Sequence, residues 1–243
     1  MSVALGKSGV FAFAALVLAA GGAAAKTSAC PAERTEIRIS KDIVEPHIDY
    51  SKRATQLETM KFRDPLASDR SFTRVAGLTV AAVTVDSEIR IASTGTAAGE
   101  PACVWPSVVT VTLSTAPTVY VGADHGQCSR EVGVGHEMEH VAIDKNVINM
   151  YGPIFRLHLV AMADAMNASP EPGLDPAAWR ARIEEKMNAV IAVVSDSLND
   201  DRSLRHRQLD SPQEYQRLSV ACPQVTLNPN ASAARARTPT TTD

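Results

Sequence analysis

The chain has 243 residues, of which 45% are hydrophobic and 21% are charged, and its formal net charge is −3. These values are ordinary for a globular protein and exclude a collagen-like, coiled-coil or wholly disordered chain. The 24 Lys and Arg residues do not outnumber the 27 Asp and Glu residues. We therefore expect no nucleic-acid partner, because nucleic-acid binding requires a surface rich in positive charge.

The first 25 residues have the layout of a secretory signal peptide. Lys7 is their only charged residue, an apolar run extends from Val10 to Ala20, and the small residues Gly21 to Ala25 follow. A positive start, a short apolar segment and a small-residue cleavage site are typical of export signals, and the run is short for a membrane-spanning helix. We expect residues 1–25 to be removed on export to the periplasm or the medium, which leaves no membrane span. An uncleaved membrane anchor is the alternative.

Strands are predicted in the first half of the mature chain, where β-branched and alternating segments recur. The predicted elements are a strand over Thr35 to Ile39, a short helix over Tyr50 to Met60, a strand region over Thr73 to Thr84, and a strand over Glu88 to Ile91.

Two further strand-like runs, Ser107 to Leu113 and Thr118 to Val121, are separated by the turn-like segment Ser114 to Pro117. Together they predict a β-hairpin. Folding the chain about the middle of the turn pairs Leu113 with Thr118 and fixes the register of the remaining pairs.

Four cysteines remain after removal of the signal: Cys30, Cys103, Cys128 and Cys222. An even number in an exported chain favours two disulfides, and no Cys-x-x-Cys spacing indicates a metal site instead. Extending the register of the hairpin places Cys103 opposite Cys128. We therefore predict the pair Cys103–Cys128 and, by elimination, the pair Cys30–Cys222.

After Gly126 the pattern becomes helical. The predicted helices run from Cys128 to Tyr151, from Ile154 to Met166, from the N-cap Asp175 to Leu198 with a short polar continuation to about Gln208, and from Pro212 to Cys222. Gly152 and Pro153 are expected to end the first of them, because proline removes a helix hydrogen bond. Ser211 and Glu214 form a capping box at the start of the last one.

Strands that precede helices predict an α+β fold. We expect a mainly antiparallel β-sheet over residues 35–125 and a helical half over residues 126–222, together forming one domain of residues 26–227. Residues 228–243 contain almost no large apolar side chain, so a disordered tail is expected there.

The helix predicted to begin at Cys128 contains His136-Glu137-Met138-Glu139-His140, an H-E-x-x-H motif. Residues four apart lie on one face of a helix, so both imidazoles can bind the same Zn²⁺ ion. Glu137 would then lie beside the metal, where it can act as general base on a zinc-bound water. The pattern predicts a zinc site with His136 and His140 as ligands and Glu137 as the catalytic residue.

This motif resembles the active-site helix of the zincin metallopeptidases. A wider layout is similar to a poorly characterised group of secreted bacterial proteins described as zinc-dependent proteases. The matching segments are Tyr50 to Leu57, Gly77-Leu78-Thr79, Cys103 to Leu113, His136 to His140, and Asp210-Ser211. They cover most of the mature chain, and only the zinc motif is specific. Glu139 departs from the zincin pattern, which keeps that position uncharged, and is expected either as a half-buried acceptor near the ligands or on an exposed face.

The third zinc ligand has several candidates. Asp210 is favoured, because it matches the late element that the resemblance implies and has no capping role of its own. Asp164 follows, since a second helix folded back on the first would bring it level with His140. His206 is the third candidate. Asp144 lies too far along the same helix to reach the same ion, and we expect it beside His140 or on the surface.

The sequence thus predicts an exported zinc-dependent metallopeptidase that hydrolyses a peptide or protein substrate, with Glu137 activating the zinc-bound water. The alternative is a non-catalytic exported protein with a structural zinc site, or a degenerate zincin that serves as a binding module. A structural zinc site has four protein ligands, whereas a catalytic site keeps one position for water.

Overall fold

The computed structural model describes residues 34–61, 76–94, 103–168 and 175–223. The signal peptide predicted at residues 1–25, the cysteine at position 30 and the tail predicted at residues 228–243 lie outside these ranges. The strands are β1 (Glu36–Ile43), β2 (His47–Asp49), β3 (Gly77–Val80), β4 (Val83–Ser93), β5 (Val104–Thr115) and β6 (Thr118–Val121), and the helices are α1 (Ala54–Lys61), α2 (Gln127–Ala168), α3 (Pro176–Leu209) and α4 (Pro212–Ala221). Strands therefore precede the long helices, and the predicted α+β class is confirmed.

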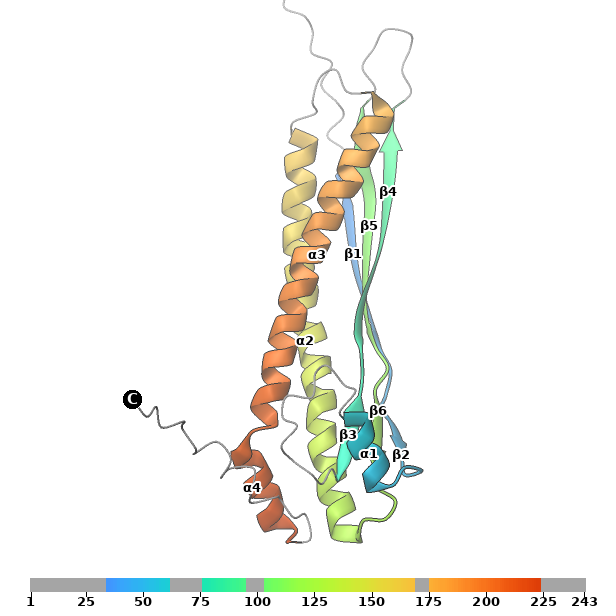
Figure 1. The fold of residues 1–243 in the computed structure, drawn as a ribbon. Coiled ribbons are helices and arrows are strands. Elements are labelled where there is room, and N and C mark those ends of the chain that lie inside the picture. The colour runs from blue at the N-terminus through green and yellow to red at the C-terminus, as the bar shows by residue number, and fades with distance from the viewer. Residues whose placement is uncertain (1–33, 62–75, 95–102, 169–174, 224–243) are drawn as a thin grey trace, which may run out of the picture.

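Two long antiparallel helices, α2 and α3, lie along one face of a narrow, elongated β-sheet (Figure 1). The sheet has two three-stranded parts placed end to end, with strand orders β1-β5-β4 and β2-β6-β3. α4 packs at the end of the molecule where β2, β3 and β6 lie. The short helix α1 is at the same end, so this end collects most of the short elements.

The two parts of the sheet share one antiparallel register. Val83 of β4 pairs with Thr115 of β5, and Val80 of β3 pairs with Thr118 of β6. The register therefore continues across a break at Pro117, which has no N–H to donate to a ladder. β1 and β2 run parallel to β5 and β6 on the other side. The sheet is mixed, where the sequence predicted mainly antiparallel pairing.

The predicted hairpin between residues 107–113 and 118–121 is wrong. β5 is a central strand, and its Leu113 pairs with Lys41 of β1 and Val85 of β4 instead of with Thr118. Both sides of β5 are occupied by strands that are distant in sequence, so β6 continues in the direction of β5 and finds its own partners. The turn-like composition around Pro117 marks an interruption of the ladder and not a reversal of the chain.

α2 is one helix of 42 residues that passes through Pro153, about 63 Å long. The predicted end at Gly152 is therefore wrong. Tyr151 and Phe155, on either side of Pro153, are both buried in the main core. Gly152 lies against β1, and a Cβ there would come within 3.1 Å of Lys41 Cε. Packing on both sides outweighs the cost of about 3 kcal/mol for an internal proline.

Both N-cap residues act as predicted, but the capping box is only half formed, because the N–H of Ser211 donates to the Leu209 carbonyl instead of to Glu214. Asp175 caps α3 by accepting hydrogen bonds from the N–H groups of Ala177 and Ala178, and Ser211 caps α4 by accepting one from the N–H of Glu214. α3 continues without interruption to Leu209. No described helix contains a segment long and apolar enough to cross a membrane.

The main core fills the space between the sheet and the two long helices. Its largest fully buried side chains include Phe155, Ile148 and Leu159 of α2, Val109, Val111 and Leu113 of β5, and Ile183, Met187 and Leu198 of α3. On α3 the buried positions recur every three or four residues to Leu198 and continue as Arg202 and His206. The buried face of α3 therefore changes from apolar to polar as it approaches α4.

Candidate metal centre

The polar end of the α2–α3 pair brings together three of the residues that the sequence singled out. His136 and His140 lie on successive turns of α2, and Asp210 is the C-cap of α3, with its backbone N–H donating to the carbonyl of His206. One ligand atom from each of the three lies within 4.8 Å of the others, so the group could hold a metal ion. Both histidines are buried and Asp210 is half-buried.

The distances within this group are those of ligands that share one ion. Asp210 Oδ1 is 3.2 Å from His136 Nε2 and 3.2 Å from His140 Nε2. Two nitrogen or oxygen ligands of a tetrahedral zinc ion are about 3.3 Å apart, since each is about 2.0 to 2.1 Å from the metal. Two imidazoles and a carboxylate are also a common zinc donor set. The residues present therefore fit a divalent metal such as zinc.

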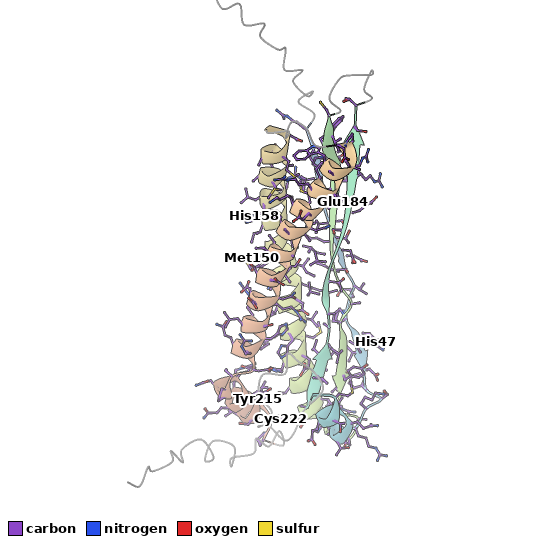
Figure 2. All side chains as sticks on the ribbon, turned by 45° about the horizontal axis from the view of Figure 1, so that its top comes forward. His47, Met150, His158, Glu184, Tyr215 and Cys222 are labelled. Carbon is purple, nitrogen blue, oxygen red and sulfur yellow. A yellow bond between two sulfur atoms is a disulfide. The ribbon has the colours of Figure 1, made fainter. Side chains whose placement is uncertain are left out.

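α4 supports the group from one side. The hydroxyl of Tyr215 donates a hydrogen bond to Asp210 Oδ1 at 3.1 Å, and the Tyr215 ring lies 5.8 Å from that of His136. Glu214 Oε1 is 3.4 Å from His136 Nδ1. The chain bends at Ser211, and α4 then continues toward the start of α2, with Tyr215 beside Asp210 and His136. Figure 2 shows Tyr215 at the end of the molecule opposite His158.

Charge within the group shifts two pKa values in opposite directions. Burial alone would raise the pKa of Asp210, but its hydrogen bonds with His136 and His140 outweigh burial and hold that pKa well below its usual range. Burial alone would lower the pKa of His136, but the carboxylates of Asp210, Glu137 and Glu214 together raise it above its usual value. Without a metal, the group therefore favours a proton on His136, and an incoming metal ion must displace it.

Glu137 is buried between α2 and the edge strand β3. A Cβ on Gly77 would overlap Glu137 Cγ and come within 3.2 Å of its Oε1, so glycine is required for β3 to approach this closely. Thr79 of β3 donates its hydroxyl to the backbone carbonyl of Glu137 at 3.0 Å. The Gly-Leu-Thr segment that the sequence marked is thus the strand that covers the Glu137 side chain.

Two of the alternative ligands lie elsewhere. Asp164 is exposed on α2, about 36 Å along the helix from His140, because α2 does not fold back after Gly152. His206 lies next to the group but not in it: its Nδ1 is 2.7 Å from His140 Nδ1.

Asp144 and Glu139 also have defined positions. Asp144 is fully buried and interacts with His206 and Arg202, so the surface position considered for it is wrong and it reaches His140 only through His206. Glu139 has 54% of its side chain exposed and lies 3.6 Å from Arg217. Of the two environments considered for Glu139, the exposed face is the one observed.

Sequence reasoning missed Arg202 and Tyr215. Arg202 precedes His206 by one helical turn on the buried face of α3, and a charged residue in an otherwise apolar stripe was a signal that could have indicated a buried partner. Tyr215 had no such signal, because its position depends on how α4 packs beside α2.

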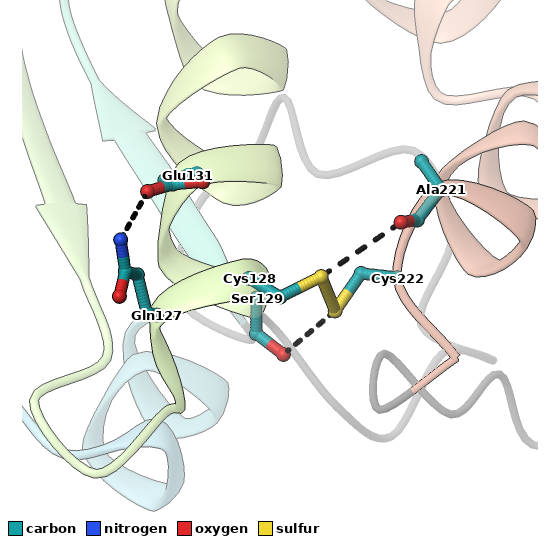
Figure 3. The surroundings of a disulfide bond; sticks show 6 residues. All are labelled: Gln127, Cys128, Ser129, Glu131, Ala221 and Cys222. Carbon is teal, nitrogen blue, oxygen red and sulfur yellow. Dashed lines mark hydrogen bonds between the residues drawn. A yellow bond between two sulfur atoms is a disulfide. The ribbon is translucent and has the colours of Figure 1, made fainter.

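A disulfide joins α4, which supports the metal group, to α2, which carries both histidines (Figure 3). Cys128, in the first turn of α2, is bonded to Cys222 at the end of α4, with a Cα–Cα distance of 5.9 Å. The predicted pairs Cys103–Cys128 and Cys30–Cys222 are therefore wrong, because they were derived from a hairpin that does not form. Cys103 is also disulfide-bonded, and it immediately precedes β5, whose first residues lie at the end of the sheet away from the metal group.

Comparison of the chain with protein-family models, with curated proteins and with solved structures finds no match.

Proposed function

We propose that the chain is an exported zinc-dependent metallopeptidase. The observation that carries this proposal is the convergence of His136, His140 and Asp210 on one point, with Glu137 on the same helix as the two histidines. Among the described residues the group has three members, which is the number of protein ligands in catalytic zinc sites. The resemblance of the H-E-x-x-H motif to zincin metallopeptidases agrees with this assignment.

His136, His140 and Asp210 would hold the metal. Bound zinc supplies Lewis acidity, which polarises a peptide carbonyl and makes water more acidic. Glu137 takes a proton from the attacking water, whose oxygen forms the new bond to the carbonyl carbon. When the C–N bond breaks, Glu137 returns this proton to the leaving amine.

The substrate would bind along β3. This strand is at the edge of the described part of the sheet, in the order β2-β6-β3, and its Gly77 lies against Glu137. Extended peptides commonly add to exposed sheet edges through backbone hydrogen bonds. A peptide paired with β3 would run past the carboxylate that acts as base.

The experiment compares Glu137→Gln with Glu139→Gln. Both variants remove one carboxylate from the same helix, but Glu139 is exposed and points to Arg217. Zinc content would be measured by elemental analysis, and hydrolysis with a fluorescently labelled unfolded protein. We expect both variants to retain zinc and only Glu137→Gln to lose activity, by at least about 100-fold. Bound zinc without hydrolysis by the unaltered chain would contradict the proposal.

A structural metal site is the second candidate, and one observation favours it. His136 and Glu137 each have only 5% of their surface exposed, so the group is more enclosed than a peptidase site needs to be. Under this proposal zinc would hold α2 and the end of α3 together, and Glu137→Gln would change neither zinc content nor any hydrolytic activity.

A further inference from the structure

A chain of buried polar side chains extends from the metal group into the protein. His140 Nδ1 lies 2.7 Å from His206 Nδ1, and His206 Nε2 lies 2.8 Å from Asp144 Oδ1. Arg202 donates to both oxygens of Asp144, from Nε at 2.6 Å and from a terminal nitrogen at 3.1 Å. Every member of this chain is buried, and Asp144 has no exposed surface.

The order of these residues fixes the direction of each hydrogen bond. Arg202 is always a donor, so Asp144 beside it is a charged acceptor. A neutral His206 must therefore donate through Nε2–H to Asp144, which leaves its Nδ1 as an acceptor. When a metal ion replaces the proton between His140 Nε2 and Asp210, His140 donates through Nδ1–H and its lone pair is on Nε2. That nitrogen is the one that lies 3.2 Å from Asp210.

We propose that His206 is a positioning residue for the metal centre, which fixes His140 in the tautomer and ring orientation that direct Nε2 at the metal. Metal-bound histidines generally donate their second N–H to a carboxylate, a carbonyl or water. His136 follows this rule directly, since its Nδ1 faces the carboxylate of Glu214. His140 reaches the carboxylate of Asp144 through the second imidazole.

The same carboxylate also connects the site to the sheet. Arg202, held by Asp144, donates from a terminal nitrogen to the backbone carbonyl of Ala81 at 3.0 Å. Ala81 lies between β3 and β4, one residue after the strand that covers Glu137. One buried ion pair thus determines the position of His206 on one side and the end of β3 on the other.

The proposal rests on the metal-binding part of the proposed function and not on peptidase activity. Its test is the zinc affinity of His206→Phe, measured by competition with a chromophoric chelator. The rings of His140 and His206 are nearly coplanar and meet edge to edge, with their centroids 5.0 Å apart and their Nδ1 atoms 2.7 Å apart, so phenylalanine keeps an aromatic ring at this position and removes both nitrogens. We expect the affinity to fall by about 10- to 100-fold. His206→Asn retains an acceptor near the position of Nδ1 and should restore most of the affinity.

Tyr151→Phe is the matched control. It removes a hydrogen bond to the Ser197 carbonyl across the same α2–α3 interface, about 16 Å along α2 from His140. It should lower stability without changing zinc affinity. In parallel, ¹⁵N NMR of the zinc-loaded chain should show the proton of His140 on Nδ1, and this readout does not require any variant to fold.

The outcomes separate the two proposals. Zinc bound as tightly by His206→Phe as by the unaltered chain, or a His140 proton on Nε2, would overturn the positioning role and leave the peptidase proposal standing. Loss of affinity in His206→Phe together with no hydrolysis by the unaltered chain would support the positioning role and overturn the peptidase. An unaltered chain that binds no zinc would overturn both.

Discussion

Asp144 carries a full charge in a position with no exposed surface. Burial alone would raise its pKa, but hydrogen bonds from His206 and Arg202 outweigh burial and lower that pKa below its usual value. A carboxylate that must be charged in the folded state stabilises the fold only while it stays ionised. The stability that Asp144 contributes to the fold should therefore be lost in acid.

We predict that Asp144→Asn lowers the free energy of unfolding of the metal-free chain by about 3 to 5 kcal/mol at pH 7, because Arg202 loses its buried counter-charge. The lowered pKa means that this contribution is complete above about pH 4, the usual pKa of an unfolded Asp, and is lost as the pH falls through the folded value. Urea unfolding measures this at pH 7 and at successively lower pH. The free energies of unfolding of the variant and of the unaltered chain should become more alike as the pH falls.

Asp201→Asn is the control for this measurement. Asp201 pairs with Arg205 at 2.9 Å on the same helix, and both side chains are partly exposed. Partly exposed pairs contribute at most about 1 kcal/mol, so this variant should unfold almost like the unaltered chain. Equal decreases in the free energy of unfolding of the two variants would show that burial of Asp144 has no special effect.

At the scale of single residues, the sequence was informative where chemistry is local. The spacing of His136 and His140 follows from helix geometry, and capping signals at Asp175 and Ser211 depend on residues within one turn. Asp210 could be singled out only by resemblance. The roles of Arg202 and Tyr215 depend on contacts between helices, which no spacing within one segment records.

For strands and helices, the contrast between local signals and contacts of distant segments is stronger. The sequence located most strands and helices, but the partners of β5 come from residues 36–43 and 83–93, and no local pattern specifies such distant pairing. The end predicted at Gly152 failed because packing against β1 and the core outweighed a local proline signal. The disulfide error followed directly from the incorrect strand partner.

α4 contributes two residues, Glu214 and Tyr215, that contact the metal group, but it is itself a short helix whose buried side chain is Leu218. The disulfide between Cys128 and Cys222 joins its end to the first turn of α2. This bond keeps Glu214 and Tyr215 beside His136 and Asp210. The positions of the residues around the metal should therefore depend on this disulfide, although it lies outside the site.

We predict that the double variant Cys128→Ser/Cys222→Ser binds zinc more weakly than the unaltered chain and unfolds more readily. The disulfide closes a sequence separation of 94 residues, for which chain-entropy arguments give about 4 to 5 kcal/mol as an upper bound. Zinc competition and urea unfolding measure the two effects. Tyr215→Phe, which removes the hydrogen bond to Asp210 and keeps the ring beside His136, should weaken zinc binding less. Unchanged zinc affinity in the double variant would mean that α4 holds its position without the disulfide.

The whole molecule is an elongated layer of sheet and helix pair with the candidate site at one end (Figure 1). Metal binding joins α2 to the junction of α3 and α4, because His136 and His140 come from one and Asp210 from the other. A ligand that binds only the folded chain raises its stability in proportion to the logarithm of the ligand concentration. Zinc should therefore stabilise the entire fold although it contacts only one end.

We predict that free zinc at 100 times its dissociation constant raises the free energy of unfolding by about 2.7 kcal/mol, measured as a rise in the thermal midpoint with zinc concentration. His140→Ala should abolish this rise. His158→Ala is the matched control, because His158 is an exposed histidine on the same helix, about 27 Å further along its axis, and it should leave the rise unchanged. A zinc-dependent rise that persists in His140→Ala but is lost in His158→Ala would place the metal outside the proposed group.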